Sequence, residues 1–328
     1  MKRARRALSA ALALGLLAVP FAAEAQPAGK VHRIGFLGAA SASGYANQLA
    51  ALRLGLHDLG YDEGRNLVIE YRWAEGQYQR LPDLAAELVA RKVTLIVTHG
   101  TPGSRAAMQA TTVIPIVMAV LGDPVESGLV ASLARPGKNV TGLTFFSSEL
   151  AAKRLEFLKE IKPRTRRIAV LLNPDNPVNR PILSAMEATA AALGVELDQV
   201  EVRGPDQFES AFAAMVAGRA DAMVVIEDAM LIAHARRIAD LAATKRLPSA
   251  GFKEYVVAGG LMAYAANFPV IWRRAAVFVD KILKGAKPDD LPIERASHFE
   301  LIVNRKTAAA LGLTIPPAVL MRADEVIE

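Results

Sequence analysis

The sequence predicts an α/β protein made of two doubly wound parallel-sheet lobes joined by a multi-strand hinge. Three observations predict this fold class. After residue 31, short apolar runs alternate with longer amphipathic stretches along the whole chain, which is the pattern of strand–helix–strand units. The pattern restarts near residue 147, and both halves begin with R-I-[GA]-[FV]-L, at 33–37 and 167–171. A late helix and strand follow the second half, so we expect the chain to cross between the lobes more than once.

The first half reads as five strands joined by helices. Periodicity predicts helices over 45–59 and 80–92, after Thr101 and after Glu126. Apolar or β-branched runs predict the strands, which cover 31–38, 66–73, 93–99, 114–120 and 139–146.

The second half repeats this order without repeating the residues. It predicts helices over 150–161, 182–193, 206–217 and 229–245, and strands over 166–173, 195–202, 220–228, 246–252 and 259–267. A helix over 270–283 ends at Lys284-Gly285, and a Pro-rich connection then leads to a strand over 298–304. We therefore expect one lobe from 31–146 plus 268–296 and the other from 147–267 plus 297–328.

The N-terminus has the three parts of a secretory signal peptide. Four basic residues lie in 2–6, an apolar run follows over 7–19, and Ala23-Glu24-Ala25 supplies the small residues of a cleavage site. We expect residues 1–25 to be removed at Ala25 and the mature protein to lie in the periplasm. The alternative, a membrane anchor, is disfavoured because the apolar run is shorter than the ~20 residues of a membrane span.

Charge and composition narrow the class of protein. Residues 1–25 carry four basic and one acidic residue, so their removal lowers the formal charge from +6 to +3. This small charge argues against a nucleic-acid partner. The apolar fraction of 52% and charged fraction of 22% are those of a globular protein. The chain contains no cysteine. We therefore expect no disulfide and no membrane anchor made of a lipid-modified cysteine.

In open α/β sheets, ligands lie beyond the carboxyl ends of the strands. Residues that follow the predicted strands are therefore the candidates for a ligand site. They combine hydroxyls, amides, a few carboxylates and aromatic rings, which suits a small polar or zwitterionic molecule with an apolar part. The candidates are Ser41, Ser43, His99, Gly100, Thr101, Pro102, Asp123, Phe145, Asn173, Asp175, Asn176, Glu227, Phe252 and Tyr264.

Several of these residues have an alternative structural interpretation. Thr101 either contacts a ligand carboxylate at the helix start or caps that helix. Asp123, which precedes Pro124, either receives a ligand ammonium group or forms a turn. The segment 173–177 (NPDNP) either forms a polar wall of the cleft or only forms turns. We expect Asp228, next to Glu227, to cap the following helix.

Catalysis has little support in the sequence. There is no G-x-S-x-G motif and no thiol, and the five histidines lack metal-ligand spacing. Neither G-x-x-x-x-G-K-[ST] nor G-x-G-x-x-G occurs. We expect no enzyme activity, no metal and no cofactor. A hydrolase or transferase, the enzyme alternative, would need a reactive group beside a positioned base.

Long phrases carry a family resemblance. They are LGYDEGRNLVIEYRWAEG at 59–76, IPIVMAVLGDPVESGLVASLARPGKNVTGLT at 114–144 and ALGLTIPP at 310–317, together with RIGFL and VTHGTP. These resemble a family of ABC-transporter substrate-binding proteins with the type I periplasmic binding protein fold. The resemblance covers about residues 30–328, and it implies uptake of tryptophan or another aromatic amino acid.

The resemblance implies a monomer that closes on a small ligand such as an amino acid and delivers it to an ABC permease in the inner membrane. Two other classes of binding protein share this fold. One is a periplasmic sensor that hands its ligand to a receptor. The other is the effector domain of a regulator, which carries a DNA-binding helix-turn-helix where this chain has its signal peptide.

Overall fold

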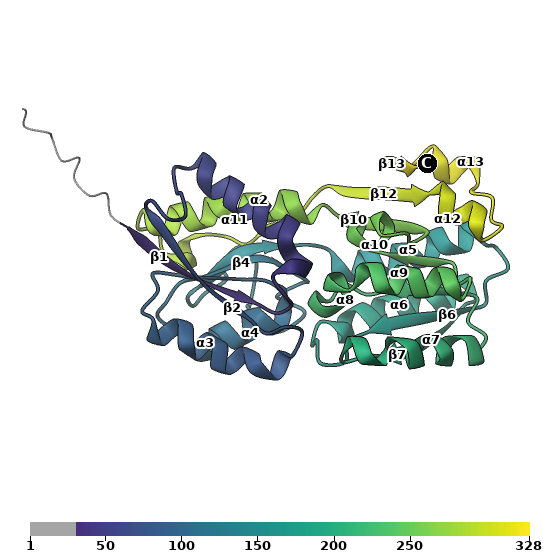
Figure 1. Ribbon diagram of the computed structural model, residues 1–328, viewed down its shortest axis with the longest axis horizontal. Coiled ribbons are helices and arrows are strands. Elements are labelled where there is room, and N and C mark those ends of the chain that lie inside the picture. The colour runs from purple at the N-terminus through teal and green to yellow at the C-terminus, as the bar shows by residue number, and fades with distance from the viewer. Residues whose placement is uncertain (1–30) are drawn as a thin grey trace, which may run out of the picture. The chain divides into compact units, whose positions relative to one another are not determined.

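The structure is a computed structural model that describes residues 31–328. Residues 32–328 form one compact unit built on two sheets, each with its own set of helices (Figure 1). The expected fold class of two doubly wound lobes is confirmed. The predicted signal peptide, 1–25, lies outside the described residues.

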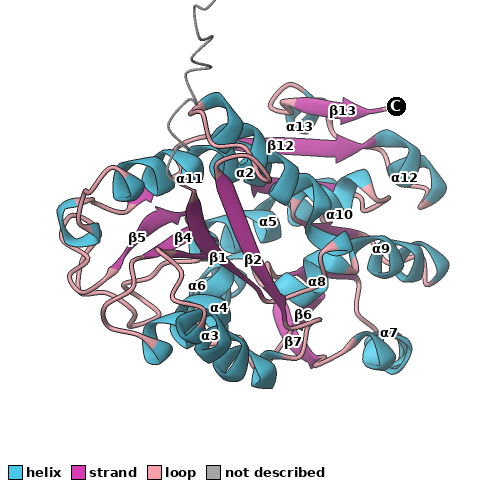
Figure 2. Cartoon of the chain, turned by 60° about the vertical axis from the view of Figure 1, so that its left-hand side comes forward, coloured by secondary structure: helices cyan, strands magenta, loops and turns pink. Residues whose placement is uncertain are grey.

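The first sheet has the strand order β11-β5-β4-β3-β1-β2, and all of its strands are parallel. Helices α2 and α11 pack on one face of this sheet, and α3 and α4 pack on the other (Figure 2). The strands are β1 (His32–Gly38), β2 (Leu67–Trp73), β3 (Ile96–Thr98), β4 (Ile116–Leu121), β5 (Val140–Thr144) and β11 (Glu294–Arg295). The helices are η1 (Ser43–Tyr45), α2 (Ala46–Asp58), η2 (Tyr78–Arg80), α3 (Leu81–Ala90), α4 (Gly100–Ala110) and α11 (Phe268–Leu283).

The second sheet has the order β13-β12-β10-β9-β8-β6-β7, parallel except where β10 meets β12. Its strands are β6 (Arg167–Leu172), β7 (Glu196–Glu201), β8 (Ala222–Val225), β9 (Ser249–Gly251), β10 (Met262–Ala266), β12 (Phe299–Asn304) and β13 (Glu325–Ile327). Its helices are α5 (Ser147–Ile161), α6 (Asn179–Leu193), α7 (Phe208–Ala217), α8 (Ala229–Ala233), α9 (Ala235–Thr244), α10 (Lys253–Val257), α12 (Arg305–Ala310) and α13 (Pro317–Leu320). Short 3-10 turns lie at η3 (Pro205–Gln207) and η4 (Pro288–Asp290).

The strand β6 shows why these apolar runs form buried strands. Ile168, Val170 and Leu172 pack in one hydrophobic cluster with residues of α5 and α6. Ala169 and Leu171 pack in another cluster with residues of α7 and α9. Successive side chains of a strand point to opposite faces, so a strand covered on both faces is apolar at every position.

Two expected helices differ in the structure. No helix follows Glu126: residues 122–139 form turns, because the Asp123 carboxylate accepts the backbone N–H groups of Val125 and Glu126. Gly128 and Gly137 then take positive φ values of 72° and 67°, a conformation that interrupts a helix. The helix predicted over 229–245 is two helices, α8 and α9, which meet at His234.

The chain passes between the two sheets three times within residues 32–328, at 145–146, at 267 and at 296–298. Aromatic side chains hold these crossings together. Phe145 packs edge-on against Phe268 with ring centroids 5.3 Å apart, and Phe146 packs likewise against Phe299 at 5.6 Å. We call this region the hinge. The residue bounds of the two lobes stay a prediction.

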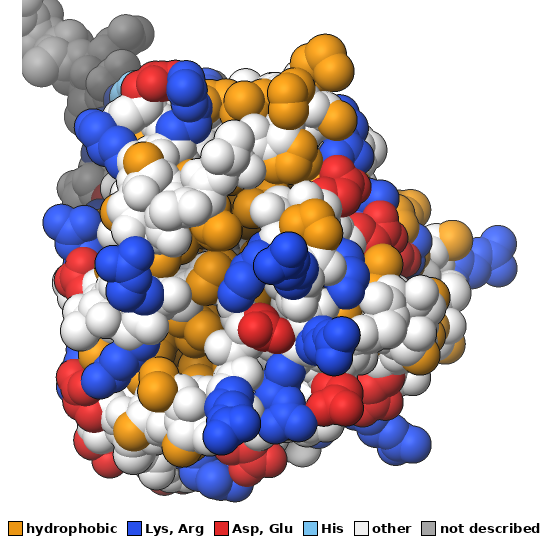
Figure 3. All heavy atoms as spheres, turned by 90° about the vertical axis from the view of Figure 1, so that its right-hand side faces the viewer, with side chains coloured by type: hydrophobic (Ala, Val, Ile, Leu, Met, Phe, Trp, Pro, Cys, Tyr) orange, Lys and Arg blue, Asp and Glu red, His pale blue; other side chains and the backbone are white. Residues whose placement is uncertain are grey.

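Surface charge on the second lobe is mixed in sign. On the face shown in Figure 3, Lys and Arg side chains alternate with Asp and Glu around a strip of hydrophobic side chains. Such interspersed charge is typical of a solvated surface. Among residues 31–328, no helix is both long and apolar enough to cross a bilayer.

Candidate functional site

A cavity with a volume of about 40 Å³ lies where the carboxyl ends of the strands of both sheets meet. Such a space holds a few water molecules, so the lobes must move apart to admit a larger molecule. Side chains of both lobes line it, so the structure shows the lobes closed on each other. The lining residues are Tyr45, His99, Gly100, Thr101, Pro102, Val120, Leu121, Gly122, Phe145, Ser147, Asn176, Val178, Glu227, Asp228, Ala229, Ile232 and Phe268.

His99, directly after β3, is a neutral wall of the cavity. Its Nε2 accepts the backbone N–H of Ala39 at 3.2 Å, and its ring lies 4.3 Å from Tyr45 and 5.2 Å from Trp272, measured between centroids. Burial lowers the pKa of His99 to about 3. The imidazole is therefore uncharged at neutral pH and contributes an aromatic face rather than a cation.

The start of α4 presents an unused hydroxyl group. Thr101 is 1% exposed, and its Oγ1 has no hydrogen-bond partner among the described residues. The alternative that Thr101 caps its helix is wrong, because His99 occupies the N-cap position and no side chain caps α4. The first N–H groups of a helix lack partners within that helix and attract anions. Thr101 therefore adds a hydroxyl donor where an anion is favoured.

A second unused hydroxyl group lies at the start of α5. Ser147 is 1% exposed, and its Oγ also has no partner in the described part of the chain. Gly122, at the end of β4, approaches it closely: a Cβ atom built on Gly122 would lie 2.9 Å from Ser147 Oγ and 2.6 Å from Val178 Cγ2. The two lobes thus touch through a glycine beside this hydroxyl.

Glu227 carries a negative charge that a buried arginine holds in place. Arg154 on α5 is fully buried and donates to both carboxylate oxygens of Glu227, with Nη1 2.9 Å from Oε2. The same guanidinium donates to the backbone carbonyls of Tyr264 and Val225. Glu227 is 6% exposed and lines the cavity. Each of its oxygens accepts one Arg154 donor group and retains capacity for another donor.

Asp228 is the N-cap of α8, as the sequence predicted. Its side chain accepts the backbone N–H groups of Met230 and Leu231. It also accepts the Tyr78 hydroxyl at 2.7 Å, which crosses from the first lobe, and the Asn176 amide at 3.0 Å. These donors occupy its acceptor capacity. Asp228 thus holds the two lobes together at the edge of the cavity.

Seven of the sequence-predicted residues line the cavity and the other seven do not. The lining residues are His99, Gly100, Thr101, Pro102, Phe145, Asn176 and Glu227. Outside it, Ser41 and Ser43 contact each other, and Asp175 lies 3.4 Å from Arg203 in an exposed ion pair. Phe252 is buried in the core of the second lobe.

The other three residues outside the cavity have structural roles. Asn173 supports Asp228, with its amide 3.4 Å from the carboxylate. Tyr264 packs its ring on Phe157 and offers its carbonyl to Arg154.

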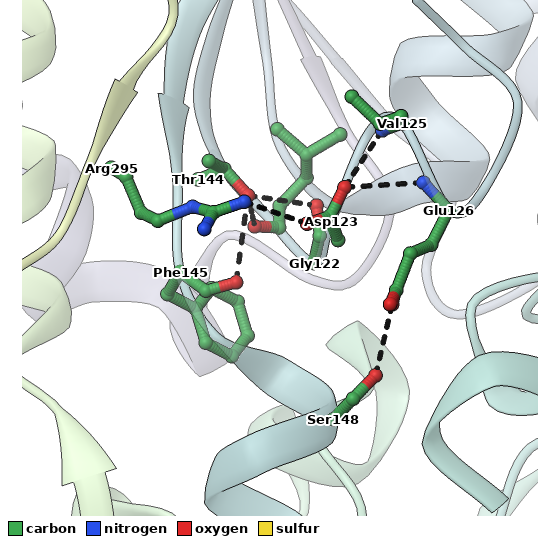
Figure 4. A network of polar contacts seen from close by, with 9 residues as sticks. Gly122, Asp123, Val125, Glu126, Thr144, Phe145, Ser148 and Arg295 are labelled. Carbon is green, nitrogen blue, oxygen red and sulfur yellow. Dashed lines mark hydrogen bonds and ion pairs between the residues drawn. The ribbon is translucent and has the colours of Figure 1, made fainter. Parts of the chain in front are cut away.

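Asp123, the third, pairs with Arg295 at 3.0 Å and closes its own turn, which is the turn interpretation of this residue (Figure 4). Figure 4 shows this pair at the hinge, beside the Thr144 hydroxyl and the Ser148–Glu126 hydrogen bond.

Sequence reasoning missed several lining residues. Gly122 directly follows β4, and Ser147 comes three residues after the end of β5, so the strand-end rule points to them as it does to Phe145. Tyr45, Ile232 and Phe268 lie on helices, and no local pattern distinguishes them from core residues. Only the tertiary fold brings these rings and side chains to the cavity.

Fold and cavity together are those of a two-lobed binding protein with polar groups gathered between the lobes. The family model for ABC transporter substrate-binding proteins matches residues 39–327. The chain belongs to this family.

Three similar proteins refine this placement. The tyrosine-binding protein of Clostridioides difficile is 27% identical over 259 residues, which is 79% of this chain and 74% of that protein. The structure of an ABC domain from Streptococcus pneumoniae in complex with L-Trp is 26% identical, with a TM-score of 0.83, and covers 91% of this chain and 100% of that one. A conserved domain protein of Vibrio cholerae is 29% identical with a TM-score of 0.84, covering 90% and 100%.

Proposed function

We propose that this protein is the periplasmic solute-binding component of an ABC importer and that it captures an amino acid between its lobes. The single observation that carries the proposal is the set of polar groups that line the cavity between the lobes. Two buried hydroxyl groups, Thr101 and Ser147, have no partner among the described residues, and the carboxylate of Glu227 is held in place by Arg154. Such a set matches a ligand with a carboxylate and an ammonium group.

The ligand carboxylate lies at the starts of α4 and α5 in this proposal. Each of these helices is longer than ten residues, and each begins at the cavity wall. Their N-terminal dipoles favour a negative charge. The Thr101 and Ser147 hydroxyls donate to the carboxylate oxygens, one from each lobe, so the ligand bridges the lobes.

The ligand ammonium group lies at Glu227. Arg154 fixes the orientation of this carboxylate, while the second acceptor position of each oxygen remains for the ligand. His99 is neutral, so no cation among the lining residues repels the ammonium group. A charge-assisted hydrogen bond of this kind contributes about 1.5–3 kcal/mol.

The ligand side chain packs among rings. Tyr45, Phe145 and Phe268 line the cavity together with Val120 and Ile232. Aromatic walls favour an aromatic or branched ligand side chain, since ring pairs add to the energy of apolar burial. Two relatives, the tyrosine-binding protein and the domain in complex with L-Trp, support an aromatic amino acid as the ligand.

The mechanism is capture by closure and involves no covalent step. In the open form the ligand contacts the first lobe, and the second lobe then closes over it by bending at the hinge. The ligand favours the closed form only by the difference between its affinities for the two forms. The closed form then docks on a permease in the inner membrane and releases its ligand there. The predicted signal peptide and the family both support a location outside the cytoplasm.

Titration calorimetry on the mature chain tests this function. L-Tryptophan, L-tyrosine and L-phenylalanine are the probes, and at least one is expected to bind with a 1:1 stoichiometry. Two analogues test the two polar ends: tryptamine lacks the carboxylate, and N-acetyl-L-tryptophan lacks the ammonium group. Both are expected to bind at least tenfold more weakly, which corresponds to 1.4 kcal/mol. Equal affinity for tryptamine and L-tryptophan would remove the carboxylate site from the proposal.

Two variants assign the carboxylate site to its residues. Thr101→Val and Ser147→Ala each remove a hydroxyl group that has no partner in the described structure. The ligand-free protein therefore loses no hydrogen bond, and its melting temperature is expected to stay unchanged. The affinity for the amino acid is expected to fall about tenfold, by the loss of one charge-assisted hydrogen bond. Ser41→Ala, outside the cavity, is the matched control and should bind as the wild type does.

A further inference from the structure

A polar contact between the lobes lies on the side of the cavity near α10. Gln48 on α2 of the first lobe donates its Nε2 to Oε1 of Glu254 on α10 of the second lobe, at 2.7 Å. The lobes touch closely beside this bond, because a Cβ atom built on Gly44 would lie 2.4 Å from Ala233 Cβ. Gln48 itself is 2% exposed. The bond therefore exists only while the lobes are closed.

The other oxygen of Glu254 has an unfavourable setting for a charge. Oε2 is buried and has no hydrogen-bond partner among the described residues. The neighbouring Lys253 ammonium is 2.6 Å from Glu300 and 3.5 Å from Glu325, so it is paired elsewhere. A buried carboxylate with one unpaired oxygen and no cation of its own is costly, whereas a neutral carboxyl group costs much less.

We propose that the Gln48–Glu254 hydrogen bond is a proton-dependent latch: closure of the cleft takes up a proton on Glu254, and opening releases it. The protonated carboxyl keeps a carbonyl-type oxygen for the Gln48 amide and places its proton on the unpaired oxygen. Closure, and with it ligand affinity, therefore strengthens as the pH falls. The effect on affinity rests on the proposed function, but the effect on closure does not.

The electrostatics of the closed form agree with this geometry. Burial raises the pKa of Glu254 from its usual value of 4.5 to about 7, and the charge of Glu227 adds to the rise. In the open form, where Gln48 and the first lobe no longer cover it, the carboxyl faces water and its pKa returns toward 4.5. A group whose pKa is higher in the closed form stabilises that form fully below pH 4.5, and this contribution is lost as the pH rises through 7.

Other ionisable groups around α10 do not provide the same switch. Glu227 is paired with Arg154, and the phenol of Tyr45 is neutral because burial raises its pKa well above 10. Asp228, whose pKa burial also raises, retains its donors from its own lobe when the cleft opens. His99 is enclosed by rings of the first lobe. The elements that pack against α10 carry the charged groups Arg236, Arg237 and Asp240 on α9 and Glu300 on β12. Glu325 on β13 lies beside Lys253 of α10.

Closure is measurable without any ligand because the chain has no cysteine of its own. Ala86→Cys on α3 and Ala213→Cys on α7 are exposed positions, one in each lobe, and accept spin labels for distance measurement. Between pH 8 and pH 6, the ratio of closed to open protein is expected to rise about tenfold, as follows from pKa values of about 7 and 4.5. Glu254→Gln carries a permanently neutral amide, so it should be more closed than the wild type at pH 8 and insensitive to pH.

The control and the ligand separate the possible outcomes. Glu187→Gln, an exposed residue on α6, should keep the wild-type pH dependence. A wild-type distance that does not change with pH, or a Glu254→Gln variant that keeps the wild-type change, overturns the latch. Titration with L-tryptophan at pH 8 and pH 6 should show an affinity about tenfold higher at pH 6. If L-tryptophan fails to bind while the distances change as expected, the proposed function fails and the latch stands.

Discussion

The two lobes contribute different chemistry to one cavity. The first lobe and the hinge supply rings, aliphatic side chains and the start of α4: Tyr45, His99, Thr101, Val120, Phe145 and Phe268. The second lobe supplies both carboxylates, the side-chain amide and one of the hydroxyl groups: Glu227, Asp228, Asn176 and Ser147. One lobe thus offers a neutral surface that packs against a ligand, and the other offers charge held by its own core.

This difference indicates that the two lobes have different roles in ligand binding. The cavity wall of the first lobe is assembled within that lobe, since His99 packs against Tyr45 and Trp272, which belong to the same lobe. An apolar ligand part therefore finds a preformed surface. In the proposed mechanism, the charges of the second lobe meet the ligand only on closure, and water is excluded at that moment. Electrostatic interactions are stronger in such a dry site.

The largest expected effect comes from breaking the charge support of the second lobe. Arg154→Met leaves Glu227 as a buried charge without its partner, and removal of one partner of a buried pair costs about 3–5 kcal/mol. The free energy of unfolding, measured in urea, should fall by that amount. The neighbouring exposed pair Lys153–Glu156 provides the control, and Lys153→Met should change stability by less than 1 kcal/mol. Replacing both partners, with Arg154→Met and Glu227→Leu, should recover much of the loss but abolish ligand binding.

The first lobe is expected to be sensitive to acid through His99. His99 has a pKa of about 3 in the folded protein and about 6.5 when unfolded. Because its pKa is depressed, the folded form is favoured above pH 6.5, and this contribution is lost as the pH falls toward 3. Each pH unit in this window removes about 1.4 kcal/mol. Urea unfolding of His99→Gln should lack this part of the slope between pH 6.5 and pH 4.5. An unchanged slope in the variant would show that His99 is accessible to protons in the folded state.

A smaller expected effect concerns the contact between the lobes. Gly122→Ala places a methyl group against Val178 and Ser147 only when the cleft is closed. Ligand affinity should fall at least tenfold, while the melting temperature of the ligand-free protein changes little. Val178→Ala removes the methyl group that the new side chain meets, so the double variant should recover part of the affinity. If Gly122→Ala binds ligand as tightly as the wild type, the lobes close differently from the arrangement described.

The sequence predicts the architecture well because local patterns determine it. Apolar runs such as 166–173 identify buried strands, and Lys284-Gly285 marks the end of α11, with Gly285 at a φ of 103°. The expected helix after Glu126 fails because Asp123 and two glycines favour turns over that segment. Helical periodicity in a short segment is weaker evidence than the turn-forming residues around it.

The site is predicted in part, for a physical reason. Strand ends are visible in the sequence, so His99, Thr101 and Glu227 are found from the rule that ligands lie beyond them. Whether a polar residue at a strand end faces the cavity depends on long-range partners. Arg154 is 73 residues from Glu227 in the chain, and Arg295 is 172 residues from Asp123. No local pattern shows that the first pair supports a wall of the cavity and the second supports the hinge.

The smallest effect is expected at Asp123, one of the candidates that lie outside the cavity. Its carboxylate is shared between Arg295 and two backbone N–H groups of its own turn, and Arg295 in turn lies 4.3 Å above the ring of Phe146. Asp123→Asn keeps an acceptor oxygen for the turn and weakens only a partly exposed ion pair, which contributes about 0–1 kcal/mol. Ligand affinity should change less than twofold, against at least tenfold for Glu227→Gln measured by the same calorimetry. A loss at Asp123 as large as that at Glu227 would mean that the hinge, rather than the charged wall of the second lobe, determines ligand affinity.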